Sequence, residues 1–506
     1  MSGSVRCQQV NRTNWGFGVL DYVIKGGTIV DGSGAPPTTG DIGVRDGVIV
    51  SVGGTITESA NETIDADGAI VTPGWVDVHT HYDGQVSWDD VMDPSAGNGA
   101  TTIVMGNCGV GFAPVRPGGE QTLIELMEGV EDIPGTALYE GMEWGQWESF
   151  PDYMVYLGGR RYSLVIGAQV AHGAVRYNVM GERGCENEEA TSADIDAMAS
   201  LVAEAVDAGA VGFSTSRTIG HRSLHGAPVP GTFAPVDELV AIARAMGRTG
   251  KGVFELIPAG TVGKLEGLGG ERFTPYEEFE LMRAVAKRGG RPVTFTLVQS
   301  PDYDQDLWRQ ILDLTAEANA DGADMHPQVS SRPIGFVTGL ESYHAFQRRP
   351  TYMALAHLPV AERAREMAKP EVKAAILSEA DVPVAEAGSM ANLYSLFQMA
   401  APMMYPLADP VDYEPTMDKT LGARMAATGR EPFDVLYDFL LEDEGRSMAA
   451  LMGGKDIADS QEVLREMLLN PHTVTGLSDA GAHVTLICDA TMPTTQLTYW
   501  VRDRKR

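Results

Sequence analysis

The sequence predicts an α/β protein built on a (β/α)8 TIM-like barrel, with a small N-terminal β-sandwich-type module before it. Two observations carry this prediction: eight short β-rich runs follow one another along the chain, and helical stretches separate most of them. Strands that alternate with helices favour a parallel sheet, and eight of them favour closure into a barrel. The runs are 74–81, 101–109, 162–173, 210–217, 252–260, 292–300, 323–331 and 473–481.

Residues 21–72 differ from the rest because they read as β-structure without helical stretches. DYVIKGGTIVDGSG (21–34) combines a short strand with a glycine turn, and GDIGVRDGVIVSVGG (40–54) alternates around an Arg-Asp-Gly turn, which predicts a hairpin. A chain of 506 residues also exceeds what one hydrophobic core accommodates. We therefore expect a small β-module over residues 1–72 and the barrel over 73–506.

The seventh and eighth runs are separated by about 140 residues, far more than an ordinary loop. Helical patterns such as VAERAREMAKPEVKAAIL (360–377) fall inside this stretch. We expect an insertion at about 336–470 that lies at the active-site end of the barrel or forms a lid. The chain ends soon after the eighth run, so truncation at its C-terminal end stays open.

Composition is that of a soluble globular enzyme, with 43% hydrophobic and 21% charged residues. A formal charge of −31 repels phosphate backbones and anionic lipids, which argues against nucleic-acid and membrane partners. The sequence has neither a secretory signal nor an apolar run long enough to span a bilayer, and its four cysteines suggest no disulfide framework. These features predict a cytoplasmic protein. Whether it forms a homo-oligomer stays open.

A His-x-His motif closes the first predicted strand. His79 and His81 are two residues apart, so on an extended chain both imidazoles point to one side and can reach one cation. A structural role for both imidazoles is the alternative. Their place at the end of an apolar barrel strand, where such enzymes keep their active sites, favours metal binding.

Two further motifs end strands that neighbour the first one. Asp479, in LSDAG, follows the eighth run, and ring closure brings that run beside the first. Its carboxylate can ligate a metal and accept a proton from water, although a turn-forming Asp is the alternative. Cys108, in GNCGVG, ends the second run between glycines. A thiolate is a good zinc ligand, whereas a lone cysteine is commonly a small buried hydrophobe.

With these motifs in view, the chain resembles the amidohydrolase superfamily. The resemblance rests on the N-terminal β-rich segments, the TPGWVDVHTH run and the late GLSDAG; the GNCGVGFAP and GFSTS segments are similar to the D-aminoacylase (N-acyl-D-amino-acid deacylase) branch. The resemblance implies a zinc centre in which His79, His81, Cys108 and Asp479 surround the metal, with Asp479 as general acid/base.

The sequence departs from that pattern where relatives carry further histidines. Such relatives place one histidine at the end of strand five and another at strand six, whereas here those runs contain Glu255 and Gln299. Strand four also lacks the lysine that many relatives use to bridge two metals. We infer one zinc ion rather than two, or a second site rebuilt with Glu255 or Gln299. Glu255 is a candidate oxygen ligand, and a buried hydrogen-bonded glutamate is the alternative.

Four other residues on the predicted rim are candidates for binding substrate. His172 follows strand three, and Arg217 and His221 lie in the loop after strand four. Arg332 follows strand seven, where a guanidinium suits a substrate carboxylate. A core histidine and solvated arginines are the alternatives, and His221 could also replace a missing metal ligand. His483 is interpreted as structural.

These observations favour a metal-dependent hydrolase that cleaves the carbon–nitrogen bond of a small amide. An N-acyl amino acid is the leading substrate, and its D-configuration comes from the resemblance. A hydrolase of cyclic amides, imides or lactones on the same scaffold is the second hypothesis. The third is a catalytically silent relative that acts by assembly, which the missing histidines favour and the retained His-x-His and Asp disfavour.

Overall fold

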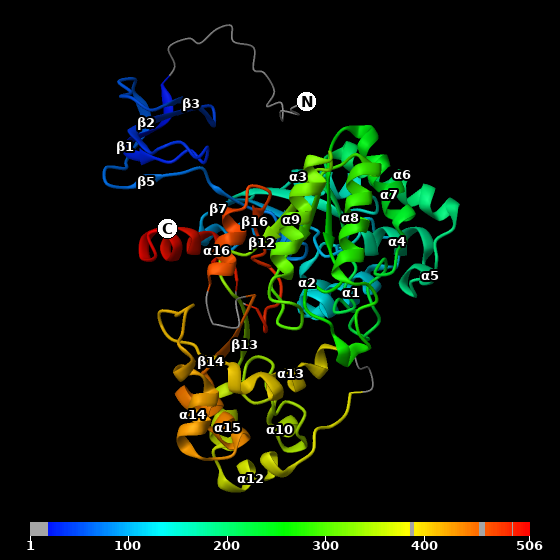
Figure 1. Cartoon of the computed structure of the whole chain (residues 1–506), viewed down its shortest axis with the longest axis vertical. Helices are drawn as coiled ribbons and strands as arrows, with labels where there is room; N and C mark the ends of the chain where they lie inside the picture. The colour runs from blue at the N-terminus through cyan, green and yellow to red at the C-terminus, as the bar shows by residue number, and fades with distance from the viewer. Residues whose placement is uncertain (1–18, 385–388, 455–460, 488) are drawn as a thin grey trace. The chain divides into compact units, whose positions relative to one another are not determined.

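The chain divides into two compact units, Met1–Gly74 and Trp75–Arg506, and the computed structural model describes residues 19–384, 389–454, 461–487 and 489–506. The first unit contains β1 (Leu20–Ile29), β2 (Thr38–Arg45), β3 (Val48–Val52), β4 (Ala60–Asp65) and β5 (Ile70–Val71) (Figure 1). β1 pairs with β2 and β2 with β3 in antiparallel fashion, while β4 and β5 both pair with β1 in parallel. The expected sandwich-type module is thus a single mixed sheet, because the later strands extend the first sheet instead of forming a second layer.

The predicted hairpin of this unit is confirmed. Arg45 pairs with Val48, and the two residues between them, Asp46 and Gly47, have φ values of 52° and 70°. Positive φ at both central residues matches the right-handed twist of the flanking strands, and an Asp-Gly pair tolerates it well.

The second unit is built on an eight-stranded parallel sheet, and each of its strands falls inside a predicted β-rich run to within one residue. The sheet order is β16-β12-β11-β10-β9-β8-β7-β6. In chain order the strands are β6 (Trp75–Asp77), β7 (Ala100–Met105), β8 (Val165–Ala171), β9 (Gly212–Ser216), β10 (Val253–Ile257), β11 (Val293–Thr296), β12 (Met325–Val329) and β16 (Val474–Thr475).

The first and last strands of this sheet meet just beyond their ends and nearly close the barrel. Thr80 forms an isolated parallel bridge with Ala480, and the backbone N–H of His81 donates to the carbonyl of Ala480 at 2.8 Å. The N–H of Asp479 donates to the carbonyl of His79 at 3.2 Å. The sequence after strand one therefore lies directly against the sequence after strand eight.

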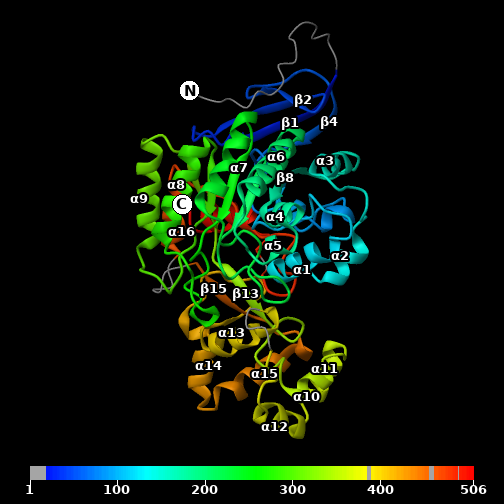
Figure 2. The same cartoon turned by 90° about the vertical axis from the view of Figure 1, so that its right-hand side faces the viewer.

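Helices cover the outside of the barrel, and Figure 2 shows α6, α7 and α8 side by side there. Two of them begin at capping boxes, Thr191 with Asp194 for α6 and Thr274 with Glu277 for α8, which satisfy the first free N–H groups. The barrel-associated helices are α1 (Glu120–Glu131), α2 (Gly135–Gly141), α3 (Phe150–Gly158), α4 (His172–Met180), α5 (Glu182–Cys185), α6 (Ser192–Ala208), α7 (Val236–Thr249), α8 (Pro275–Gly289), α9 (Leu307–Ala320), α16 (Glu462–Leu469) and α17 (Met492–Thr495).

The stretch between β12 and β16 forms a body with its own core, which we call the insert domain (residues 334–453; yellow to orange in Figure 1). Its sheet, ordered β13-β15-β14, is antiparallel, and Val337 of β13 donates to the carbonyl of Leu486, which follows the eighth barrel strand. Its elements are β13 (Ile334–Thr338), α10 (Pro350–Leu355), α11 (Val360–Met367), α12 (Pro370–Ser378), α13 (Leu393–Ala400), β14 (Tyr405–Pro406), α14 (Leu421–Thr428), α15 (Pro432–Gly445) and β15 (Ala449–Gly453).

Across the residues that the structure describes, no helix combines the length and the apolar character needed to span a bilayer.

Candidate metal centre

Three buried side chains that could ligate a metal meet where β6 and β7 end. The Sγ atom of Cys108 lies 3.3 Å from Nε2 of His79 and 3.8 Å from Nε2 of His81. One ligand atom from each of the three residues falls within 4.8 Å of the other two. The structure thus brings together the two histidines and the cysteine that the sequence singled out.

The spacing of these atoms fits a zinc ion. In a tetrahedral site with Zn–N bonds near 2.0 Å and Zn–S bonds near 2.3 Å, neighbouring ligand atoms are about 3.3–3.5 Å apart. The observed separations of 3.3 and 3.8 Å are close to that value. Imidazole nitrogen and thiolate sulfur are also the donors that zinc prefers.

Asp479 lies beside both imidazoles, as ring closure predicted. Its Oδ1 atom is 3.5 Å from Nε2 of His79 and 3.8 Å from Nε2 of His81. The side chain of Asp479 is 18% exposed, against 2% and 0% for the two imidazoles, so it is the carboxylate of this group that solvent or a substrate can reach. Burial would raise the pKa of Asp479, but the neighbouring His81 and His79 outweigh burial and hold that pKa below its ordinary value.

Both imidazoles present Nε2 to the cluster and Nδ1 to a polar partner behind it. Nδ1 of His79 is hydrogen-bonded to Oε1 of Gln328 at 2.8 Å, and Nδ1 of His81 lies 3.4 Å from Oε1 of Glu131. Burial lowers the pKa of His79 and lowers that of His81 to about 4. Both rings are therefore neutral near pH 7, which is the form that binds a metal.

Glu255 stands outside this cluster. Its Oε1 lies 3.9 Å from Nδ1 of His79, whereas Cys108 contacts Nε2 of the same ring. Burial raises the pKa of this fully buried carboxyl well above its ordinary value, and the backbone N–H of Cys108 opposes that rise only in part. The structure thus places this candidate ligand behind His79, at the distance of an outer contact.

Two titratable residues, Glu131 and His483, lie at the site although the sequence analysis did not place them there. Glu131, the last residue of α1, is buried between His81 and His483, and its Oε2 lies 3.4 Å from Nε2 of His483. From the sequence alone His483 is interpreted as structural; the structure places its ring 6.4 Å, centroid to centroid, from that of His81. No strand pattern precedes Glu131, so nothing local marked it.

His221 faces the same group of residues. Its Nδ1 is hydrogen-bonded to Oγ of Ser216, at the end of β9, at 2.9 Å. Burial, followed by the proximity of His483 and His81, lowers the pKa of His221 to about 3. A neutral imidazole held in this way can donate or accept a hydrogen bond through its other ring nitrogen.

The other three predicted substrate contacts have partners inside the protein. His172 uses both ring nitrogens, for Thr215 at 2.8 Å and Glu238 at 2.9 Å. Arg217 pairs with Glu278 at 2.8 Å, and Arg332 with Asp489 at 2.7 Å. These three side chains are all 1% exposed or less, and a buried guanidinium requires such a carboxylate partner. These three side chains are therefore hydrogen-bonded inside the protein, and they are not exposed at the rim of the barrel as expected.

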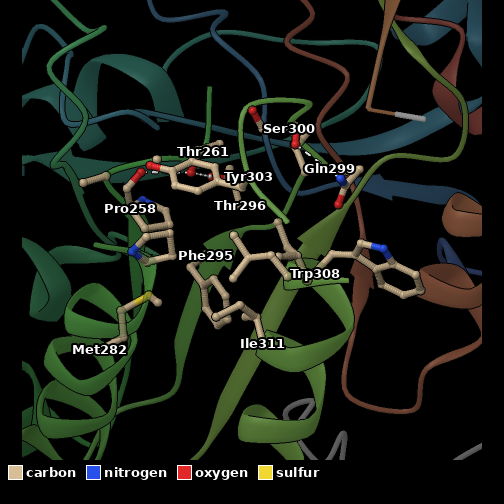
Figure 3. Close-up of a pocket in the computed structure, with 16 residues that line it drawn as sticks. Pro258, Thr261, Met282, Phe295, Thr296, Gln299, Ser300, Tyr303, Trp308 and Ile311 are labelled. Carbon is tan, nitrogen blue, oxygen red and sulfur yellow. Dashed lines mark hydrogen bonds between the residues drawn. The ribbon is translucent and has the colours of Figure 1, made fainter. Parts of the chain in front are cut away.

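A small pocket lies at the ends of β10 and β11 and is separate from the metal centre. Figure 3 shows Phe295, Met282 and Ile311 forming its apolar side, with Gln299 and Tyr303 at its polar edge. Its volume of about 40 Å³ holds no more than a few water molecules. Gln299 lines this pocket, and its side-chain amide donates to the carbonyl of Ser300.

Metal donors at the carboxyl ends of parallel barrel strands are typical of metal-dependent hydrolases. The profile of the Amidohydrolase family matches residues 62–506, and the chain belongs to this family. The predicted resemblance to D-aminoacylases is confirmed: the chain is 30% identical over 231 residues to a D-aminoacylase of Alcaligenes xylosoxydans xylosoxydans, covering 46% of this chain and 43% of the relative. An N-acyl-D-aspartate deacylase of the same organism is 32% identical over 231 residues, with 46% and 42% covered.

Solved structures show the same fold. An N-acyl-D-glutamate deacylase from Bordetella bronchiseptica, complexed with zinc and a phosphonate inhibitor, aligns with a TM-score of 0.59 and 22% identity over 96% of this chain and 82% of its own. A D-aminoacylase structure aligns equally well, with a TM-score of 0.59 and 20% identity over the same shares. The chain spans less than half the length of the curated relatives it matches.

Proposed function

We propose that this protein hydrolyses the carbon–nitrogen bond of a small amide with one zinc ion held by His79, His81 and Cys108. The observation that carries the proposal is the contact of the Asp479 carboxylate with both imidazoles, at 3.5 and 3.8 Å, on the solvent-reachable side of the cluster. Zinc at this position would polarise the amide carbonyl and activate water. The substrate is a small molecule, and the first candidates are N-acyl-D-amino acids, because relatives carry the names of such deacylases.

The residues of the site have distinct tasks in this proposal. The two imidazoles and the Cys108 thiolate hold the metal, and Gln328 is hydrogen-bonded to Nδ1 of His79 on the far side of the ring. Asp479 takes a proton from the attacking water and returns it to the leaving nitrogen, which needs a carboxylate that is ionised and reachable. Its depressed pKa and its 18% exposed side chain meet both conditions. His221, held by Ser216, supplies a neutral hydrogen-bonding group for the substrate.

Recognition of a substrate carboxylate is not assigned to Arg217 or Arg332, because buried acids already neutralise both. Cyclic amides are the second candidate substrates. A D-hydantoinase of Rhizobium radiobacter is 44% identical over 90 residues, which cover 18% of each chain. One assay that offers both N-acyl-D-amino acids and cyclic amides to the protein distinguishes these two candidates.

The test compares N-acyl-D-amino acids, N-acyl-L-amino acids, hydantoins and lactones on zinc-loaded protein, with the Asp479→Asn variant as control. The expected result is hydrolysis of one amide class by the wild type and a loss of at least about 100-fold in the variant, with unchanged thermal unfolding. Wild-type rates in Asp479→Asn would contradict the proton-transfer role. Less than about 0.2 equivalents of tightly held zinc, with no activity after zinc addition, would instead favour the silent scaffold.

A further inference from the structure

The carboxyl group of Glu131 lies between two imidazoles of the candidate metal centre. Its Oε1 is 3.4 Å from Nδ1 of His81, and its Oε2 is 3.4 Å from Nε2 of His483. The backbone carbonyl of Glu131 also accepts the N–H of His483, at 2.5 Å. One residue at the end of α1 therefore contacts both the strand-one loop and the strand-eight loop.

In the described part of the chain, one of these two facing pairs has no hydrogen bond to any other group. His81 Nδ1 and Glu131 Oε1 are both buried, and among the described residues neither makes a hydrogen bond elsewhere. Leaving a buried donor or acceptor without a hydrogen bond costs free energy. Nδ1 of His81 as donor and Oε1 of Glu131 as acceptor can satisfy each other. The arrangement repeats what Gln328 does for His79, where Oε1 lies 2.8 Å from Nδ1.

Resting on the proposed zinc centre, we propose that Glu131 is a positioning residue that fixes the ring of His81. With a proton on Nδ1 directed at Glu131, the lone pair of Nε2 points toward Cys108 and the metal. Carboxylates that accept from the outer nitrogen of a ligating histidine fix its tautomer and raise its basicity, and losing one costs 10–100-fold in metal affinity.

The same turn also holds the loop that carries Asp479. Asp132, which follows Glu131 with a left-handed φ of 51°, accepts the N–H and the hydroxyl of Thr485 at 3.1 and 2.6 Å. Its other oxygen accepts the hydroxyl of Tyr343, in the insert domain, at 2.8 Å. The end of α1 thereby fixes His81 on one side and residues 483–485 on the other.

The variant that tests the proposal is Glu131→Gln, which keeps the shape of the side chain and replaces one of its two oxygens by an amide group that can only donate. Glu125→Gln is the matched control: Glu125 lies on the same helix and faces the exposed His225 at the same distance, 3.4 Å. Zinc affinity is measured by competition with a chromogenic chelator, and the ligand field by the absorption spectrum of the cobalt-substituted protein. We expect Glu131→Gln to bind zinc 10–100-fold more weakly and to change the cobalt spectrum, and Glu125→Gln to match the wild type.

Wild-type zinc affinity and an unchanged cobalt spectrum in folded Glu131→Gln would overturn the positioning role but would not contradict the proposed metal centre. A wild type that binds neither metal would overturn the proposed function and this inference together. Should Glu131→Gln not fold, ¹⁵N NMR of histidine in the zinc-loaded wild type decides the matter: a proton on Nδ1 of His81 supports the proposal, and a proton on Nε2 contradicts it.

Discussion

Replacing Gly481 by alanine adds one atom, the Cβ, where the loop after strand eight contacts the loop after strand one. Gly481 has a φ of +90°, and a Cβ there would lie 2.8 Å from the carbonyl carbon and oxygen of His81 and 2.9 Å from the nitrogen of Tyr82. All three atoms belong to the backbone, so relief requires either the segment that carries the imidazoles or the segment that carries Asp479 to move. Reaching an ordinary contact of 3.4 Å demands a shift of about 0.6 Å.

The expected cost has two parts. A positive φ in a residue with a Cβ costs about 1 kcal/mol, and overlap with a packed backbone adds about 1–3 kcal/mol. We therefore expect Gly481→Ala to lose about 2–4 kcal/mol of unfolding free energy. A shift of about 0.6 Å also exceeds the tolerance of about 0.2 Å in metal–ligand distances, so zinc affinity should fall at least tenfold.

Gly145→Ala is the control, because Gly145 has nearly the same φ, +86°, and open space where a Cβ would stand. It should lose only the backbone cost and keep wild-type zinc affinity. Denaturant unfolding of the zinc-free proteins and a zinc competition titration measure the two effects separately. The reasoning is refuted if Gly481→Ala loses no more stability than Gly145→Ala and binds zinc as tightly as the wild type.

Three further changes have defined outcomes. Cys108→Ser should weaken zinc binding at least tenfold, since a hydroxyl is a poorer zinc ligand, and should remove the sulfur-to-cobalt absorption band; a retained band would exclude the thiolate as ligand. Zinc at 100 times its Kd should add about 2.7 kcal/mol of stability over chelator-treated protein, and a His79→Ala/His81→Ala variant should show no such gain. Burial, with Arg363 nearby, lowers the pKa of His344 from its ordinary 6.5 to about 3, so this ring stays neutral in the fold but takes up a proton on unfolding in acid. Stability should therefore fall as pH drops below about 6.5, by at most about 1.4 kcal/mol per pH unit, and denaturation curves of His344→Asn at pH 7 and pH 5 should differ less than those of the wild type.

The parts of this protein that sequence patterns predicted are those set by local periodicity. Each barrel strand falls within one residue of a predicted run, because strands covered on both faces are rich in apolar residues. His79 and His81 share a direction because alternate residues of an extended chain do. Asp479 could be placed beside them because a ring of eight strands leaves strand one next to strand eight.

The parts that were missed depend on contacts between distant segments. Arg217 and Arg332 look like rim cations in the sequence, but their partners Glu278 and Asp489 lie 61 and 157 residues further along the chain. Glu131 reaches the centre only because α1 ends against the strand-eight loop. The N-terminal strands were recognised, but whether they form one sheet or two depends on pairing partners that local patterns do not encode.

The most direct test is an anomalous difference map recorded at the zinc edge from crystals of zinc-loaded protein. We predict one strong peak within bonding distance, about 2.0–2.3 Å, of Nε2 of His79, Nε2 of His81 and Sγ of Cys108, with the Asp479 carboxylate beside it. Zinc held by other residues, or a map with no peak near these three atoms, would contradict the proposed centre.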